Sequence, residues 1–345
     1  MLYVTTRSSR DAFTAQRALR ENRGPDGGLY VPFRTPQFTA EDIEALAEKS
    51  FNKCVAETLN VLFNTQLTSW DIDLCIGRYS VRLEKLGHRI LMGECWHNLD
   101  WQFSRMTAKL TELICSDKAV SPTDWGEVGV RIAVLFGIFG ELIREGIAGP
   151  EKKVDISVVS GNFSAPMSAW YARRWGLPIG NIVCCCNENG NLWDFICHGQ
   201  LRTDGVAVQT ITPDTDVLTP SGLERLIHDC VGAEEANRYV ESCRRGSTYY
   251  IEDKLLHELR RGIYVTVTSS RRVESTIPSV YATHSYLLSP YSALAYAGLQ
   301  DYRARTGESR YALVLAEKSP LRDAEVTAKA LGITAEELKR YIDRH

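Results

Sequence analysis

The sequence predicts an α/β fold, in which a mostly parallel and twisted sheet carries helices on both faces. An apolar, β-branched run at 154–159 leads into a short turn and then into apolar residues at helical spacing. Gly176, Leu177 and Pro178 end that helix, and residues 182–186 have the composition of a second buried strand. A strand, a helix and a strand in this order form a βαβ unit, whose two strands are parallel.

The composition is that of an ordinary globular protein. The chain has 345 residues, of which 44% are hydrophobic and 24% charged, and its net charge is −3. This length can bury a large core, and so small a net charge gives no field that would recruit nucleic acid or an anionic membrane. The sequence shows no secretory leader and no apolar run long enough to cross a bilayer, so we expect a cytoplasmic protein.

Ten cysteines are scattered along the chain without the paired C-x-x-C spacing of a zinc site. Cys184, Cys185 and Cys186 are consecutive in the second strand, so the middle one should face the opposite way from its neighbours. We therefore expect reduced, buried cysteines and no metal. A metal cluster that also uses Cys197 and His198 is the alternative interpretation.

Outside the βαβ unit, local signals predict further elements. Residues 2–7 suit a short strand, and Arg7 and Asp26 suit a structural pair at a Pro-Asp-Gly-Gly turn. Thr39 and Thr334 should each cap a helix whose first turn is acidic. Periodicity predicts helices over 57–63, 70–86 and much of 231–262, and a strand over 263–268.

The turn between the first strand and its helix is a candidate anion site. It consists of Ser160, Gly161, Asn162, Phe163 and Ser164. Small or turn-forming residues at such a junction leave backbone N–H groups unpaired at the helix N-terminus. A phosphate or a carboxylate is the natural ligand for those groups.

Several motifs in this order resemble the threonine synthases. The chain start, the Pro-Asp-Gly-Gly-Leu-Tyr-Val-Pro run at 25–32, the 160–164 turn and Asn187-Glu188-Asn189 stand where that family has similar segments. The resemblance covers most of the chain. It implies an N-terminal region over 1–88, packed as one unit with a fold-type II large domain over 89–345. It also implies that the 160–164 turn lies where the family holds the phosphate of pyridoxal phosphate (PLP).

The same resemblance places Ser104 where threonine synthases carry the lysine that forms the Schiff base with PLP. Serine forms no imine, so the covalent tether and its proton shuttle are missing. The nearest lysine, Lys109, is five residues further along a predicted helix and should face elsewhere. We therefore expect no threonine synthase activity and no cofactor, although noncovalent binding of PLP stays open.

Two further departures from the family concern the rest of the pocket. The segment after Cys115 lacks the small domain that grips the substrate carboxylate, and we expect a homodimer or a protein partner over the face so exposed. Of the remaining pocket residues, Asn187 is kept, whereas Glu317 and Ser319 replace a threonine and a histidine. We interpret Glu317 and Lys318 as an ion pair at the end of a strand.

Replacement chemistry is the alternative to a loss of activity. His97, Asp100 and Ser104 are spaced i, i+3 and i+7, which would bring them onto one face of a helix and supply a nucleophilic set. A polar, locally hydrogen-bonded helix start explains the same pattern.

The leading hypothesis is therefore a threonine-synthase-like pseudoenzyme that binds a ligand or a partner and has a regulatory role. Its ligand would be a phosphorylated or carboxylate small molecule. The rival is a PLP-independent enzyme that acts on a phosphorylated amino acid or similar molecule in amino-acid or secondary metabolism.

Overall fold

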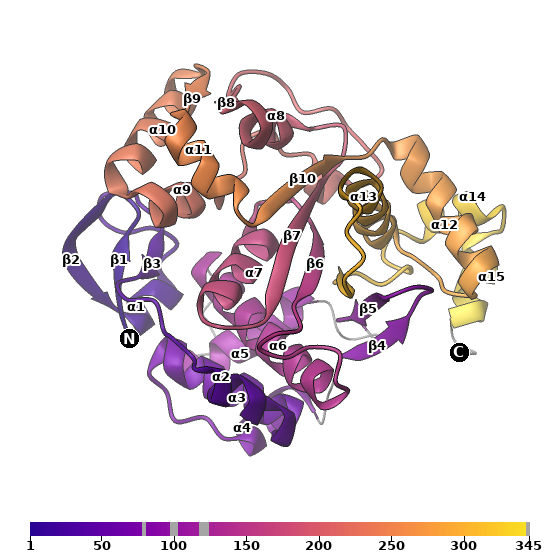
Figure 1. Cartoon of the computed structure of the whole chain (residues 1–345), viewed down its shortest axis with the longest axis horizontal. Coiled ribbons are helices and arrows are strands. Elements are labelled where there is room, and N and C mark those ends of the chain that lie inside the picture. Colours follow the sequence, from indigo (N-terminus) through magenta and orange to yellow (C-terminus); the bar gives the residue numbers. More distant parts are fainter. Residues whose placement is uncertain (78–80, 97–102, 117–123, 343–345) are drawn as a thin grey trace.

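The computed structural model describes residues 1–77, 81–96, 103–116 and 124–342 (Figure 1). Its centre is a six-stranded sheet in the order β10-β7-β6-β11-β5-β4. The first five strands of that order pair in parallel, and only β4 is antiparallel to its neighbour. The strands are β4 (Arg82–Lys85), β5 (Ile90–Glu94), β6 (Val154–Val159), β7 (Ile179–Cys186), β10 (Ile263–Val267) and β11 (Ala312–Ala316). The predicted α/β class with a mostly parallel sheet is confirmed.

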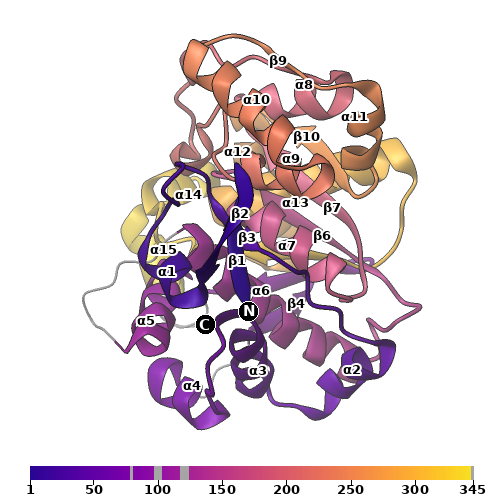
Figure 2. The same ribbon diagram turned by 90° about the vertical axis from the view of Figure 1, so that its left-hand side faces the viewer.

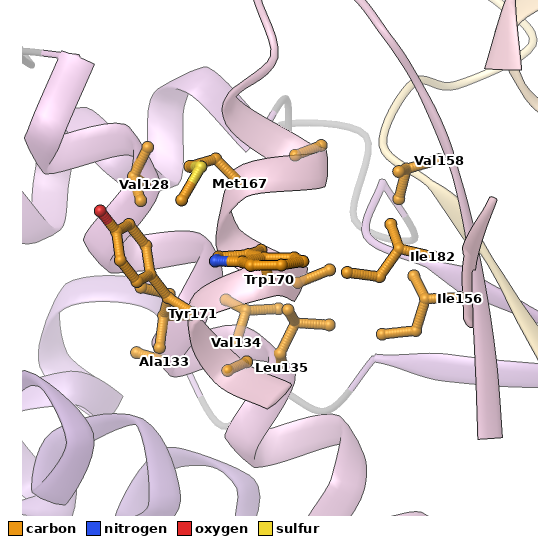
Figure 3. Packing of buried hydrophobic residues seen from close by; sticks show 14 of the residues in the cluster. Val128, Ala133, Val134, Leu135, Ile156, Val158, Met167, Trp170, Tyr171 and Ile182 are labelled. Carbon is orange, nitrogen blue, oxygen red and sulfur yellow. The ribbon is translucent and has the colours of Figure 1, made fainter. Parts of the chain in front are cut away.

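The predicted βαβ unit is β6, α7 (Ser164–Arg174) and β7, with the two strands as direct neighbours. The helix α7 is buried along most of its length. Figure 3 shows its Trp170 and Met167 between side chains of α6 (Asp124–Arg144) and apolar residues of the sheet such as Ile156. The unit forms because every strand residue but the last is buried, so both faces of β6 need a cover.

Helices cover both faces of the sheet. On one face α7 packs against the strands, α6 packs against α7, and α3 (Phe51–Phe63) lies behind α6. On the other face α13 (Pro290–Thr306) packs against the strands and α12 (Ser270–His284) packs against α13. Cys184 and Cys186 belong to the first core and Cys185 to the second, which confirms that the three thiols alternate. In the part of the chain that the structure describes, no three His, Cys, Asp or Glu side chains are grouped to hold a metal.

The N-terminal region forms a small antiparallel sheet beside the main one (Figure 2). It contains β1 (Leu2–Thr5), β2 (Ser8–Thr14) and β3 (Tyr30–Pro32), with α1 (Ala15–Arg20) between the last two. Thr39 caps α2 (Ala40–Glu44) through a capping box with Asp42, as predicted, and a short 3-10 helix (Ala45–Glu48) follows. The strand β2 has no buried residue, so it carried no alternating pattern to predict it.

Two predicted helices are wrong in extent. The pattern over 70–86 is a helix only as α4 (Ser69–Ile76), because Gly77 ends it and β4 then adds a charged strand to the sheet edge. The region 231–262 is broken into separate helices by glycines and by a short strand pair. Its elements, with the preceding helix, are α9 (Leu223–Val231), α10 (Ala233–Arg245), α11 (Asp253–Arg260), and β8 (Gln200–Leu201) paired with β9 (Tyr249–Tyr250).

The remaining elements complete the two layers. They are α5 (Phe103–Cys115), α8 (Asn191–His198), the 3-10 helix η2 (Pro213–Thr215), α14 (Ala324–Leu331) and α15 (Ala335–Ile342). Thr334 accepts from the Glu337 N–H, and the Glu337 carboxylate accepts from the Thr334 N–H, so the predicted cap of α15 is confirmed. None of the described helices is both long and apolar enough to cross a membrane.

Candidate functional site

The 160–164 turn joins the carboxyl end of β6 to α7. The Ser160 N–H donates to the Cys185 carbonyl at 2.9 Å, and the Phe163 N–H donates to the Ser160 carbonyl at 2.8 Å. Gly161 and Phe163 both have positive φ, at 43° and 74°. The Asn162 side chain folds back, and its Oδ1 accepts from the Ser164 N–H at 3.0 Å.

In this geometry several backbone N–H groups of the turn have no hydrogen-bond acceptor among the described residues. In the described structure, the N–H groups of Gly161, Asn162 and Ala165 make no hydrogen bond, and Pro166 has no N–H to offer. Ser164 is buried, yet its hydroxyl donates to no described residue. Three free N–H groups at the start of an 11-residue helix suit an anion, because the helix dipole adds to their partial charge.

A segment around η2 lies across the turn. The Gly222 N–H donates to the Asn162 carbonyl at 3.0 Å, and the Asp214 carbonyl lies 3.6 Å from the point that a Cβ on Gly161 would take. Asn187, which the sequence assigns to the pocket, holds this segment in place. Its buried Nδ2 lies within hydrogen-bond distance of Thr210, Thr212, Thr215 and Asp216, at 2.6–3.2 Å.

A small cavity adjoins the first turn of α7. It is lined by Val158, Val159, Ala165, Tyr291, Leu315, Glu317 and Lys318, and its volume is about 20 Å³. One water molecule needs about that much space. A pocket for a small organic ligand has on the order of 300 Å³ or more. The cavity therefore has room for a water or a small ion between these walls.

Two sets of ion pairs surround this cavity. Glu317 accepts two hydrogen bonds from the Arg131 guanidinium, at 3.0 and 3.1 Å. Lys318 and Arg322 both donate to the Asp214 carboxylate, Arg322 at 2.8 Å. The expected pair between Glu317 and Lys318 is wrong, because Glu317 is bound by Arg131 and Lys318 by Asp214.

Lys318 is enclosed on two sides. Its ammonium lies 3.4 Å from the centroid of the Tyr291 ring, and its side chain is 17% exposed. Burial lowers the pKa of Lys318, and the Asp214 carboxylate opposes part of that effect. Burial alone would raise the pKa of Asp214, but Lys318 and Arg322 outweigh it and the pKa lies below its usual value.

The other residues assigned from the sequence lie apart from this cluster or outside the described residues. His97 and Asp100 fall outside the described residues. Ser104 lies in the first turn of α5, and its side chain is not among those described. Lys109 is exposed on α5 and influences Cys75 of α4, so the expectation that it faces elsewhere is confirmed. The Ser319 hydroxyl accepts from the Leu321 N–H at 3.2 Å and so shapes the turn after β11.

Sequence reasoning missed most of the charged residues here. The position of Lys318 directly after β11 is a usable signal, because the carboxyl ends of parallel strands meet at one edge of the sheet. Arg322 follows one turn later. Asp214 is 104 residues away from Lys318 in sequence, and no local pattern marks it.

The residues present do not fit a covalently held PLP. The resemblance puts a serine where the amine would be, and Glu317 at the position facing the pyridine nitrogen is bound by Arg131. Lys318 is an amine within the site, but it lies after β11 rather than on α5 and is engaged by Asp214 and Tyr291. The free N–H groups of the turn would suit a phosphate alone.

Comparisons with known proteins agree with the sequence motifs. The family profile described as "Threonine synthase N terminus" matches residues 2–79. Threonine synthase-like 1 of Pongo abelii is 30% identical over 177 residues, which is 50% of this chain and 24% of that protein. The matched segment thus spans about a quarter of the length of the threonine synthase-like 1 proteins. Threonine synthase of Pseudomonas aeruginosa is 22% identical over 404 residues, covering 88% of this chain and 85% of that protein.

Solved structures share the fold. PLP-bound threonine synthase from Brucella melitensis superposes with a TM-score of 0.84 at 19% identity, over 96% of this chain and 92% of that one. Yeast threonine synthase gives a TM-score of 0.82 at 16% identity, over 96% and 90% of the two chains. Together with the profile match at the N-terminus, these findings show that the chain is similar to the threonine synthases over residues 2–79 and shares their fold.

Proposed function

We propose that this chain is a member of the threonine synthase family that has lost PLP-dependent chemistry and binds a small anionic molecule at the carboxyl end of its central sheet. The observation that carries the proposal is the 160–164 turn. Its free N–H groups suit an anion, while the residue that would tether PLP by the family resemblance is a serine. A phosphate or carboxylate ligand satisfies those donors without any covalent bond.

The loss of the small domain belongs to the same proposal. The alignment with the Pseudomonas aeruginosa enzyme extends over 404 residues and therefore exceeds the 345 residues of this chain. The relative must carry segments that this chain lacks. A site without a second domain would have no cover to exclude water, which suits reversible binding better than catalysis.

Titration with inorganic phosphate and with PLP tests the proposal. We expect saturable thermal stabilisation by phosphate, since a ligand that binds only the folded state raises its stability. We expect no stoichiometric adduct on a lysine of the site after addition of PLP and reduction with borohydride, as judged by visible absorption and by peptide mapping. Exposed lysines react with PLP in any protein, so only a stoichiometric adduct on one lysine of the site, such as Lys318, would contradict the loss of PLP chemistry.

The variant Asn162→Asp makes the test specific to the turn. Aspartate keeps the acceptor for the Ser164 N–H and adds a negative charge beside the free donors, so the fold should persist while phosphate binding weakens by about tenfold. Gln66→Glu, at an exposed residue between α3 and α4, adds the same charge elsewhere and should leave binding unchanged. Equal binding by both variants and the wild type would place the anion outside the turn.

A further inference from the structure

The amino end of the central sheet holds a second cavity, the amino-end cavity. Its volume is about 410 Å³, and small-molecule sites have on the order of 300–1,000 Å³. Residues that precede four neighbouring strands contribute to its wall: Lys153 precedes β6, Pro178 precedes β7, Arg261 precedes β10 and Arg310 precedes β11. The 160–164 turn follows the carboxyl end of β6, so the two sites lie at opposite edges of the sheet.

The wall of the amino-end cavity is positively charged. Four of the residues that line it are cations and none is acidic, the cations being Lys153, Arg173, Arg261 and Arg310. Arg261 pairs with Glu258 at 3.1 Å outside the cavity wall. Arg310 pairs with Glu308 at 2.6 Å, and the Asp155 carboxylate lies 3.7 Å from it. Each guanidinium has five N–H donors, so both arginines keep donors for a further acceptor.

Arg173 and Lys153 have no carboxylate partner among the described residues. Arg173 stands in the last turn of α7, where its guanidinium lies 5.1 Å from the centroid of the Trp170 ring and donates to the Gly180 carbonyl at 3.3 Å. Burial lowers the pKa of Arg173, and no acidic side chain opposes that effect. Lys153 is exposed and makes no hydrogen bond or ion pair in the described structure. Two positive charges of the cavity are therefore open to a ligand.

Two glycines make room for the arginines of this wall. A Cβ on Gly262, directly before β10, would overlap the Arg173 guanidinium. A Cβ on Gly180 of β7 would lie 2.9 Å from Nη1 of Arg310 and would also meet the Asp155 carboxylate. Neither glycine has a φ in the left-handed region, so the backbone conformation does not require glycine there. The bare backbone instead lets both guanidiniums lie against the strand ends, which fixes them in the wall.

We infer that the amino-end cavity binds a small molecule with two or more neighbouring oxyanion groups. Arg173 and Lys153 supply the unpaired charges, and the planar fork of an arginine matches phosphate and carboxylate alike. Leu177 and Pro178 add apolar wall that suits the carbon skeleton of such a ligand. The inference does not depend on the function proposed for the 160–164 turn.

Pyrophosphate and citrate are the probes for this site. Calorimetry measures their binding to the Asn162→Asp protein, in which the turn is disfavoured for anions, so that the amino-end cavity is observed alone. We expect at least one probe to bind at one molecule per chain. Binding of pyrophosphate alone would identify the oxyanions as phosphates, and binding of citrate alone would identify them as carboxylates. If neither probe binds at millimolar concentration, the inference is overturned.

Substitution of the unpaired cations places the bound probe. Lys153→Gln and Arg173→Gln, each added to the Asn162→Asp protein, should weaken binding by about tenfold, because each removes a charge-assisted hydrogen bond. Lys153 is exposed, so this variant keeps the test decisive if Arg173→Gln fails to fold. Lys152→Gln is the matched control, because it removes the same charge at the adjacent exposed residue, which does not line the cavity. This control should bind the probe as tightly as its parent.

The outcomes separate this site from the turn. If Lys153→Gln and Arg173→Gln bind the probe as tightly as their parent, the anion lies elsewhere and the inference is wrong, whatever phosphate does at the turn. If Lys152→Gln weakens binding as much as Lys153→Gln, the effect is one of general charge and the inference is also overturned. If Lys153→Gln alone of these two weakens binding, while Asn162→Asp leaves the phosphate binding of the wild type unchanged, the amino-end cavity stands and the function proposed for the turn is wrong.

Discussion

Glu224 is one of the residues that join the N-terminal region to the main body. Its carboxylate is 4% exposed and accepts from the Thr6 hydroxyl and from Arg7 at 3.2 Å. Asp26 instead accepts from the Thr5 hydroxyl and the Gly28 N–H, and Arg7 reaches only its backbone carbonyl. Arg7 and Asp26 thus meet at the turn as predicted, but through the Asp26 carbonyl, and the carboxylate partner of Arg7 comes from α9, more than 200 residues away.

Glu224→Gln should destabilise the protein strongly. The amide leaves the Arg7 guanidinium, which is 9% exposed, without its counter-charge, and breaking a buried pair in this way costs about 3 kcal/mol. Urea unfolding measures the effect. Glu241→Gln breaks an exposed pair with Arg245 and should change the free energy of unfolding by less than about 0.5 kcal/mol. Equal effects of the two substitutions would show that burial does not set the strength of the Glu224 contacts.

Glu141 on α6 should make stability depend on pH. Burial raises its pKa from 4.5 to about 7, with Glu145 adding to the rise and Arg144 opposing it. The folded state then holds the proton to higher pH than the unfolded state, so stability falls as pH rises from 4.5 through about 7. Glu141→Gln stays neutral and should have the same melting temperature as the wild type at low pH but a higher one at pH above 7. A constant difference across that range would contradict the raised pKa.

At the scale of elements, the closest helix packing joins α3 to α6. A Cβ on Gly129 would lie 2.5 Å from the Phe63 ring, and one on Gly137 would lie 2.6 Å from the Phe51 ring. Two aromatic rings of α3 thus pack directly against two glycines of α6. The φ values of both glycines are those of an ordinary helix, so the backbone conformation does not require glycine. Glycine is needed at these positions because a side chain would block the close approach of the two rings.

Gly137→Ala should therefore destabilise the protein, although alanine favours a helix by about 1 kcal/mol. The new methyl group would force the buried Phe51 ring to move, and overpacking of this kind costs about 1–3 kcal/mol. Gly149→Ala is the matched control, because a Cβ there meets nothing within 4 Å. Thermal or urea unfolding compares the two variants, and a more stable Gly137→Ala protein would show that Phe51 moves freely.

For the whole molecule, α4 offers an apolar surface that the fold leaves uncovered. Trp70 and Leu74 are 63% and 69% exposed and stand one helical turn apart. The helix α4 packs on α5, which ends at Cys115, where the family resemblance places the missing domain. We propose that a second copy of the chain covers this face, as the sequence led us to expect.

Light scattering after size exclusion tests this proposal. We expect a dimer for the wild type and a monomer for the double variant Trp70→Ser and Leu74→Ser, because the loss of apolar contact area removes the driving force. Val206→Ser changes a side chain that is 92% exposed elsewhere and should leave the dimer intact. A monomeric wild type at micromolar concentrations would contradict the proposal.

Local sequence patterns predicted those elements whose hydrophobic periodicity and capping residues lie within the element itself. The βαβ unit from β6 to β7 and the capped helices at Thr39 and Thr334 needed only periodicity and capping chemistry. The helix predicted over 70–86 was wrong because periodicity alone does not reveal an edge strand such as β4, which is stabilised by pairing with β5. The 160–164 turn was predicted because its small residues adjoin a helix N-terminus.

The sequence by itself determined the fold class, the turn at 160–164 and the serine at the position of the lysine, because the residues that specify each feature are close together in the chain. The tertiary structure alone decided which charges meet at the site. Lys318 pairs with Asp214 rather than with the adjacent Glu317, and Glu317 pairs with Arg131, 186 residues away. The partners of Glu317 and Lys318 come from α6 and η2, so the packing of these distant elements sets the pairing and the order of residues in the chain does not.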